Sequence, residues 1–458
     1  MDLSRRRLIA VSALTGAVPA DFATQANAAS STTFGIDAIR LGVRAGGGAD
    51  QTAMLQAAID QAAGAKVPLL LGPGDYRVAG LKLSSGTQIV GVRGSTRLVF
   101  SALPGSAAAN SFLIAAFSAR HVTLSGLTFE GGGVPMPERS ALLNFANCDE
   151  LRIEDCEILN AGRAALRLEG VRGAVTGNVI ANAADVALYS LDARGLTIAD
   201  NTVRGAGNGG ILVHRSAKGD DGTLVIDNRI EDIRNVAGGS GQFGNAINVY
   251  RAGNVIVRGN RIARAAFSAV RGNAASNIQI ANNLATDIGE VAIYSEFGFE
   301  GAVIANNTVD GAAIGISVVN FNEGGRLATV QGNLIRNLKA KRPAGTDPGD
   351  SAGVGICVEA DAAVTGNVVE SAPGAGISVG WGAFMRDVTV TGNVVRSARH
   401  GITLSVTNGA GMAIVTGNLI SGAKNGAIVG MDHAKAVTDL EREPTRYANL
   451  QVSGNRVR

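Results

Sequence analysis

A short phrase built around an asparagine returns through most of the chain. It first reads Val175-Thr-Gly-Asn-Val-Ile180 and last reads Val452-Ser-Gly-Asn-Arg-Val457. The intervals between successive asparagines run from 23 to 37 residues. The asparagines are Asn178, Asn201, Asn228, Asn260, Asn283, Asn307, Asn333, Asn367, Asn393, Asn418 and Asn455. A period of twenty-odd residues with variable excess indicates a repeat protein, in which each unit stacks on its neighbours.

Each repeat contains three short runs in which apolar residues alternate with others, as in Gly210-Ile-Leu-Val-His214. Alternation of period two is typical of strands that bury every second side chain. Three strands per unit describe one triangular coil, so we expect an all-β chain folded as a right-handed parallel β-helix of about 12–14 coils. A leucine-rich repeat is the nearest alternative, but its Leu-x-x-Leu-x-Leu frame is absent.

The asparagine of each phrase follows one strand and precedes the next, often after glycine. Asparagine tolerates the left-handed backbone of a sharp bend. One per coil would place the amides above one another, where each can bond to the coils above and below. We therefore interpret the eleven asparagines as an internal structural ladder.

The region before the repeats predicts an end cap. Asp50 is a natural N-cap for a helix over about 51–63, in which Met54, Leu55, Ala58, Ile59 and Ala62 share one face. Such a helix would cover the apolar end of the first coil. We expect residues 29–100 to hold this cap and the first coils, and 101–458 to hold the repeats, with loop insertions near 338–352 and 431–447.

The first residues resemble an export signal. Ser4-Arg5-Arg6 precedes an apolar stretch, and Ala26-Asn27-Ala28 is a small-x-small cleavage pattern. We expect a twin-arginine signal over 1–28, cleaved after Ala28, with an ordinary secretory signal as the alternative. The apolar stretch is too short for a permanent anchor. The mature protein is then expected in the periplasm or medium, with the twin-arginine translocase as a partner during export and no membrane anchor.

The export signal, the capping helix with the Gly72-Pro-Gly-Asp-Tyr76 turn, and the Val-x-Gly-Asn-x-Val coils together resemble a known family. This is the family of twin-arginine-translocated repeat proteins of uncharacterised function, within the pectin-lyase-like superfamily. The resemblance covers nearly the whole chain. It implies the fold and the compartment, and it implies no activity.

Composition excludes several functions. The formal net charge is only +3, which gives no electrostatic case for nucleic acid. No metal-ligand spacing and no glycine-rich phosphate loop is present, so we expect neither a metal nor another cofactor. Of the three cysteines, Cys156 takes the place of a ladder asparagine, and a Cys148–Cys156 disulfide is one option.

Any chemistry must lie on the strand between successive asparagines, where the outward side chains form two columns. The first column reads Arg167, Tyr189, Leu212, Asn248, Arg271, Tyr294, Ser317, Cys357, Ser378, Thr403 and Val429. The second reads Glu169, Leu191, His214, Tyr250, Asn273, Glu296, Val319, Glu359, Gly380, Ser405 and Met431. Large polar side chains gather in the middle coils, whereas the later coils carry mostly small ones.

The middle coils suggest proton abstraction next to a carboxylate. The candidate catalytic residues are His214, Tyr250, Arg271 and Tyr294. Arginine would neutralise a uronate carboxylate while histidine or tyrosine moves the C5 proton. The candidate substrate-binding residues are Arg167, Tyr189, Asn248 and Glu296.

The best hypothesis from these residues is binding, and β-elimination or C5-epimerisation, of an acidic polysaccharide. A non-catalytic envelope binding or scaffold protein is the alternative. A glycoside hydrolase ranks third, because Glu169 and Glu296 lie five coils, about 24 Å, apart.

Overall fold

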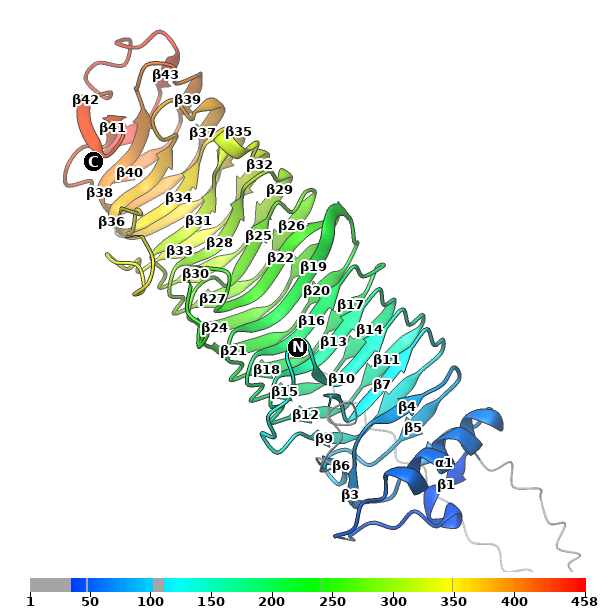
Figure 1. Cartoon of the computed structure of the whole chain (residues 1–458). Helices are drawn as coiled ribbons and strands as arrows, with labels where there is room; N and C mark the ends of the chain where they lie inside the picture. The colour runs from blue at the N-terminus through cyan, green and yellow to red at the C-terminus, as the bar shows by residue number, and fades with distance from the viewer. Residues whose placement is uncertain (1–33, 47, 102–110, 240, 348) are drawn as a thin grey trace, which may run out of the picture. The chain divides into compact units, whose positions relative to one another are not determined.

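The computed structural model describes residues 34–46, 48–101, 111–239, 241–347 and 349–458. Residues Gly35–Arg458 form one compact unit, here called the body. Its strands wind into stacked coils, and each coil adds one strand to each of three faces (Figure 1). The fold class is therefore the predicted parallel β-helix, and a helix stands near the start of the body. The predicted export signal lies outside the described residues.

The first face is a parallel sheet of sixteen strands within the described residues, formed by the runs that precede the asparagines. Its strands are β1 (Ile36–Asp37), β2 (Leu69–Leu70), β5 (Gln88–Val90), β8 (Thr123–Ser125), β11 (Leu151–Glu154), β14 (Gly173–Thr176), β17 (Thr197–Ala199), β20 (Leu224–Ile226), β23 (Ile256–Arg258), β26 (Ile278–Ala281), β29 (Glu300–Ala305), β32 (Arg326–Gln331), β35 (Ala360–Thr365), β37 (Arg386–Thr391), β39 (Ala413–Thr416) and β43 (Leu450–Ser453).

The second face follows the asparagine corner. Its strands are β3 (Gly74–Val78), β6 (Thr96–Phe100), β9 (Thr128–Glu130), β12 (Glu157–Leu159), β15 (Val179–Ala181), β18 (Thr202–Arg204), β21 (Arg229–Ile233), β24 (Arg261–Ala265), β27 (Leu284–Thr286), β30 (Thr308–Asp310), β33 (Leu334–Arg336), β36 (Val368–Val379), β38 (Val394–Ser405), β40 (Leu419–Ser421) and β44 (Arg456–Val457). The long strands β36 and β38 continue onto the third face.

The third face, here called the platform, carries the two predicted columns. Its strands are β4 (Leu81–Leu83), β7 (Ile114–Phe117), β10 (Ala141–Ala146), β13 (Ala164–Glu169), β16 (Val186–Leu191), β19 (Gly209–Asp220), β22 (Asn245–Gly253), β25 (Val270–Asn273), β28 (Val291–Glu296), β31 (Ile314–Val318), β34 (Val354–Val358), the second halves of β36 and β38, and β41 (Ile428–Asp432). Inward residues of all three faces form one apolar core of mostly Val, Ile, Leu and Ala.

The asparagines lie inside the body as a continuous ladder. Each amide from Asn178 to Asn418 donates through Nδ2 to Oδ1 of the asparagine one coil on, at 2.9–3.0 Å. Each backbone N–H in that run donates to the same Oδ1. Cys156 extends the series, because its N–H donates to Asn178 Oδ1. The ladder thus satisfies polar groups that burial would otherwise leave unpaired.

The helix α1 (Thr52–Gly64) covers the edge of β4. The amide of Gln56 donates to the carbonyl of Lys82 and accepts from its N–H, both at 2.8 Å, as a neighbouring strand would. Asp50 accepts from the N–H of Thr52 at 3.0 Å, one position earlier than the N-cap itself. The buried face holds four of the five expected residues, whereas Met54 is exposed.

At the other end, β42 (Lys435–Asp439) pairs antiparallel with β41 and covers its free edge. Two short 3-10 turns, η1 (Ala38–Leu41) and η3 (Phe321–Glu323), complete the described elements. Cys148, Cys156 and Cys357 are all free thiols, so the optional disulfide is absent. In the described part of the chain, no helix combines the length and apolar character needed to cross a membrane.

Candidate functional site

The platform places the residues of the predicted columns side by side. Every neighbouring pair of the first column, from Arg167 to Val429, is in register on adjacent strands. The second column is in register as predicted from Glu169 to Glu296. The strand register inferred from the repeat is therefore confirmed.

In the middle coils three rings and two guanidinium groups form one group, here called the aromatic stack. His214 of β19 packs edge-to-face between Tyr189 of β16 and Tyr250 of β22, with ring centroids 5.3 and 5.5 Å away. Arg167 lies 4.9 Å over the ring of Tyr189, and Arg251 lies 4.8 Å over that of Tyr250. Cation–π and edge-to-face geometry both favour this arrangement, so these side chains contact one another.

The aromatic stack determines the protonation of His214. Burial lowers the pKa of His214 from 6.5 to about 4, because the charged ring loses its hydration. Its Nε2 has no hydrogen-bond partner among the described residues. The imidazole is therefore neutral at neutral pH and a weak base.

Arg271 of β25 is held by protein groups on all sides. Its Nε and Nη2 donate to the two oxygens of Glu296 at 2.6 and 3.0 Å, and Nη1 donates to the carbonyl of Gly241 at 2.8 Å. Asn273 also donates to Glu296, at 2.9 Å. Glu296 is only 2% exposed, so the pair is buried and bidentate. Recognition of a uronate by Arg271 would require breaking this pair.

Two further candidates are also enclosed. The guanidinium of Arg271 lies 5.1 Å over the ring of Tyr294 on β28, and burial, reinforced by Glu296, raises the pKa of Tyr294. Asn248 of β22 is 7% exposed, and its Oδ1 is buried without a hydrogen-bond partner among the described residues. The middle coils thus bring the predicted residues together as a mutually packed layer, and Tyr294 also lines a cleft over the later coils.

The open space lies over the later coils, as a groove composed of two clefts. One cleft of about 410 Å³ runs from Tyr294 to Trp381. The next, of about 330 Å³, runs from Trp381 to His433. The clefts share five lining residues, namely Gly349, Ser351, Ser378, Gly380 and Trp381. We take these joined clefts, here called the groove, as the candidate site.

The floor of the groove is recessed because the outward residues of the first column are small there. Ser317, Cys357, Ser378 and Thr403 occupy successive registered positions on β31, β34, β36 and β38. They leave room that Tyr, His and Arg fill in the middle coils. Burial raises the pKa of the Cys357 thiol to about 12, so this thiol is protonated and unreactive.

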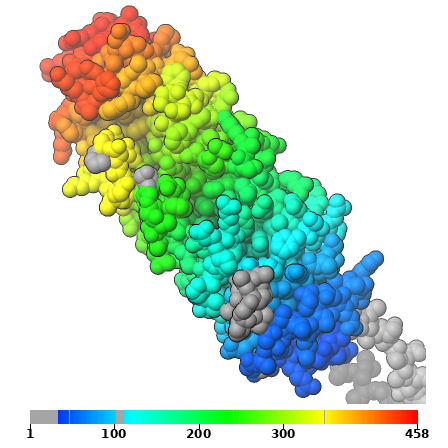
Figure 2. Space-filling model, in the orientation of Figure 1, coloured from blue at the N-terminus to red at the C-terminus, as the bar shows by residue number. Residues whose placement is uncertain are grey.

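One wall is the insertion between β33 and β34, residues 339–347 and 349–352, here called the strap. Figure 2 shows this segment in yellow, projecting from the side of the body. Arg342 fastens it by donating to Glu290 at 2.7 Å and to the carbonyl of Ser351 at 2.8 Å. Lys339 donates to Asp287 at 2.8 Å. The strap is therefore tied to the coils on the N-terminal side of the groove.

The opposite wall comes from two turns that follow β36 and β41. Trp381 and Phe384 form an isolated bridge that closes a short turn, and the side chain of Trp381 is 45% exposed. The ring of His433 packs edge-to-face on Trp381, 5.6 Å between centroids. An exposed tryptophan beside a floor of hydroxyl and glycine residues presents a flat apolar surface next to hydrogen-bonding groups.

Three carboxyl groups line the first cleft. Glu359, which follows β34, accepts a hydrogen bond from the N–H of Phe321 at 2.7 Å, and burial raises its pKa. Asp347 and Asp350 come from the strap and are exposed. Asp350 also lies 3.4 Å from Arg342. A carboxyl group with a raised pKa and two loop carboxylates therefore face the same space, a combination that the two columns do not predict.

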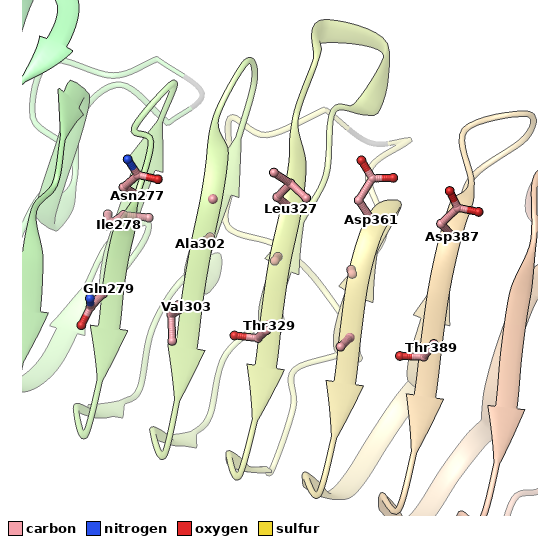
Figure 3. A pocket seen from close by; sticks show the side chains of 14 residues that line it. Asn277, Ile278, Gln279, Ala302, Val303, Leu327, Thr329, Asp361, Asp387 and Thr389 are labelled. Carbon is pink, nitrogen blue, oxygen red and sulfur yellow. The ribbon is translucent and has the colours of Figure 1, made fainter.

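A second hollow, of about 590 Å³, lies on the first face over β26 to β37 (Figure 3). Asn277, Asp361 and Asp387 line one side of it. Arg386 donates to both oxygens of Asp361 and holds the pKa of that carboxyl below its usual range. The floor is mostly Ala, Gly, Val and Thr, and of the two carboxylates at its side Asp361 is already bound by Arg386. Within the described ranges, no three of His, Cys, Asp and Glu are grouped to hold a metal ion.

The stacked coils define a right-handed β-helix protein, and the groove is a candidate site on one of its faces. The family model described as the right handed beta helix region matches residues 74–230 and 216–395, and the chain belongs to that family. No curated protein sequence matches the chain.

Solved structures with the same fold come from phages and bacteria. The N-terminal fragment of bacteriophage phi29 gene product 12 matches at 16% identity with a TM-score of 0.57, covering 93% of this chain and 71% of that one. The catalytic unit of a GH87 alpha-1,3-glucanase from Streptomyces thermodiastaticus matches at 16% and 0.50, covering 93% and 69%. Tailspike protein 3 of bacteriophage CBA120 matches at 11% and 0.52, covering 92% and 61%. The chain thus spans about two thirds of these relatives, and the likeness shows the fold alone.

Proposed function

We propose that this protein binds a polysaccharide along the groove and cleaves its glycosidic bonds by hydrolysis. The observation that carries the proposal is the set of three carboxyl groups in the first cleft, of which Glu359 has a raised pKa. Glycosidases use one carboxylic acid to protonate the leaving oxygen and a second carboxylate to activate water or attack the sugar. One of the solved relatives is itself a glucanase catalytic unit.

Each groove residue has a role in this proposal. Glu359 donates its proton to the glycosidic oxygen, and the N–H of Phe321 orients its carboxyl group. Asp350 or Asp347 acts as the second carboxylate from the strap. Trp381 supplies a stacking surface for a sugar ring, and the floor hydroxyls bond to the sugar hydroxyls. Partial burial of Glu359 strengthens the interaction between this group and the charge that develops in the transition state.

The test is to incubate the mature protein with a panel of uronate-containing and neutral polysaccharides. New reducing ends without unsaturated ends are expected, because hydrolysis adds water across the bond. Binding without any new ends would support the non-catalytic binding or scaffold alternative. Neither binding nor cleavage across the panel would contradict the proposal.

β-Elimination or C5-epimerisation at the aromatic stack is the second candidate. It is favoured by the neutral His214, whose Nε2 has no hydrogen-bond partner in the described part of the chain and whose ring lies beside Tyr250. It is weakened by Arg271, which already binds Glu296 through two hydrogen bonds. Unsaturated ends, or a changed epimer ratio in the product, would favour this candidate over hydrolysis.

We also propose that the protein is exported by the twin-arginine route to the periplasm or medium, as a member of the twin-arginine-translocated repeat proteins. The support is Ser4-Arg5-Arg6 and the cleavage pattern that ends at Ala28. Sequencing the N-terminus of the exported protein should give Ala29. Replacing Arg5 and Arg6 together with Lys should leave the precursor in the cytoplasm, and continued export of that variant would contradict the route.

A further inference from the structure

The two clefts of the groove differ in charge. The first is lined by Glu359, Asp347 and Asp350, and the one arginine among its described lining residues, Arg342, is shared between Glu290 and Asp350. The second has no Asp or Glu among its described lining residues, but it does have an arginine and two histidines. The charge of the groove therefore changes from acidic to basic across the shared residues around Trp381.

Arg399 is the cation of the second cleft that no carboxylate neutralises. It lies on β38, exposed, and no carboxylate of the described residues is within ion-pair distance of it. The side-chain amide of Asn425 accepts from Arg399 Nε at 3.2 Å when its oxygen faces the arginine. The carbonyl of Asn425 faces Nδ1 of His400 at 3.0 Å. A guanidinium in a cleft with free N–H donors is suited to a planar anion.

The histidine beside Trp381 already has an acidic partner. His433 Nδ1 lies 2.8 Å from Asp432, a residue that does not line the cleft. The ring of His433 also packs edge-to-face on Trp381, which borders the first cleft as well. A sugar stacked on Trp381 would therefore lie between the carboxyl groups of one cleft and Arg399 of the other.

We infer that the groove takes an acidic glycan in one fixed register, with an anionic sugar in the second cleft against Arg399. The inference rests on the proposed function and adds the substrate class and the direction of the chain. A carboxylate or sulfate on the sugar would be repelled by the acidic cleft and attracted by Arg399. Binding of the anionic sugar by Arg399 therefore fixes which sugar of the chain lies in the acidic cleft, where cleavage occurs.

The test measures the affinity of Glu359→Gln protein, which should bind without cleaving. The probes are galacturonate and alginate oligosaccharides with their methyl-esterified counterparts, and a sulfated oligosaccharide with its desulfated counterpart. The acidic form should bind about tenfold more tightly than its neutral counterpart, and added salt should reduce the difference. The carboxylate and sulfate arms identify which anion the cleft prefers.

Arg399→Gln, added to the same protein, should remove this roughly tenfold preference and leave binding of the neutral counterpart unchanged. The matched control is Arg396→Gln, on the same strand but outside the groove, where the side chain faces Glu370 at 3.7 Å. Both arginines are exposed, so neither change should impair folding, and an unchanged melting temperature checks this. The control should keep the preference.

The outcomes separate the two proposals. Equal binding of acidic and neutral oligosaccharides, with cleavage of either by the unmodified protein, would overturn the acidic register and leave the hydrolase proposal standing. A preference that survives Arg399→Gln would also overturn it. No binding of any probe and no cleavage of the polysaccharide panel would overturn both.

Discussion

The middle and the later coils of the platform share one backbone geometry and differ in what their outward side chains do. In the middle coils Tyr189, His214 and Tyr250 pack on one another, and Arg271 is bound by Glu296. In the later coils the same column holds Ser, Cys and Thr, and the groove lies above it. Large polar residues on adjacent coils, about 4.8 Å apart, satisfy one another, whereas small ones leave room for a ligand.

This difference shows that, in a solenoid, the surface with the most large polar and aromatic side chains need not be the surface that binds a ligand. The rich surface of the middle coils is a structural layer, and the groove depends on side chains brought from turns and from the strap.

Glu359→Gln should lower kcat/KM for polysaccharide cleavage by about 10²- to 10⁴-fold, because the general acid is lost. Tyr250→Phe, in the aromatic stack, should change it little. Initial rates of reducing-end formation measure both. A larger loss of kcat/KM in Tyr250→Phe than in Glu359→Gln would show that the active site lies in the middle coils.

The pH profile is the control for this assignment. Since burial raises the pKa of Glu359, its proton is present below that pKa and is lost as pH rises through it. Activity should therefore fall on the basic side of the optimum. In Glu359→Gln, the residual activity should no longer fall on the basic side of the pH optimum.

Arg271→Met should destabilise the body by about 3–5 kcal/mol, because the buried carboxylate of Glu296 then loses the cation that pairs with it among the described residues. The matched control is Arg264→Met, which removes an exposed arginine paired with Asp232 and should cost little. Denaturant midpoints compare the two. A cost no larger than that of the control would mean that Arg271 is free to serve a substrate.

His214 should make stability depend on pH. Its folded pKa of about 4 lies below its ordinary 6.5, so the stability it contributes is present above 6.5 and is lost as pH falls toward 4. The loss is about 3 kcal/mol at most. His214→Phe keeps a ring in the aromatic stack and should remove this part of the acid destabilisation, as followed by melting temperature against pH. Substituting the exposed His121 is the control, and an equal effect there would contradict the assignment.

Trp381→Ala should weaken oligosaccharide binding about three- to tenfold, because a stacking surface is lost. Trp381→Phe should restore part of the affinity. Calorimetric titration with an oligosaccharide that the protein cleaves measures both. Unchanged affinity in Trp381→Ala would show that the sugar does not stack in the groove.

The fold could be predicted from the sequence because each coil repeats the same alternating apolar runs and the same asparagine corner. The asparagine ladder fixed the register so closely that Tyr294 and Ser317, or Ser378 and Thr403, pair as the columns predicted. These interactions join neighbouring coils and recur in every unit, so one pattern carries them.

The groove could be predicted only in part. The small residues of its floor and Glu359 were visible in the columns, and the strap was visible as an insertion. The contact between Arg342 and Glu290 joins residues 52 positions apart, and no repeat encodes it. The placement of Asp350 and Trp381 also depends on turns that occur once, so the sequence pattern contains no second copy from which to infer them.

The structure of Glu359→Gln protein with a bound oligosaccharide tests the central claim most directly. Sugar rings are expected over β31 to β41, between the strap and Trp381. The substituted side chain at position 359 should lie beside a glycosidic oxygen, and Arg399 beside an anionic substituent. Rings bound over β19 to β28, against His214 and Tyr250, would contradict it.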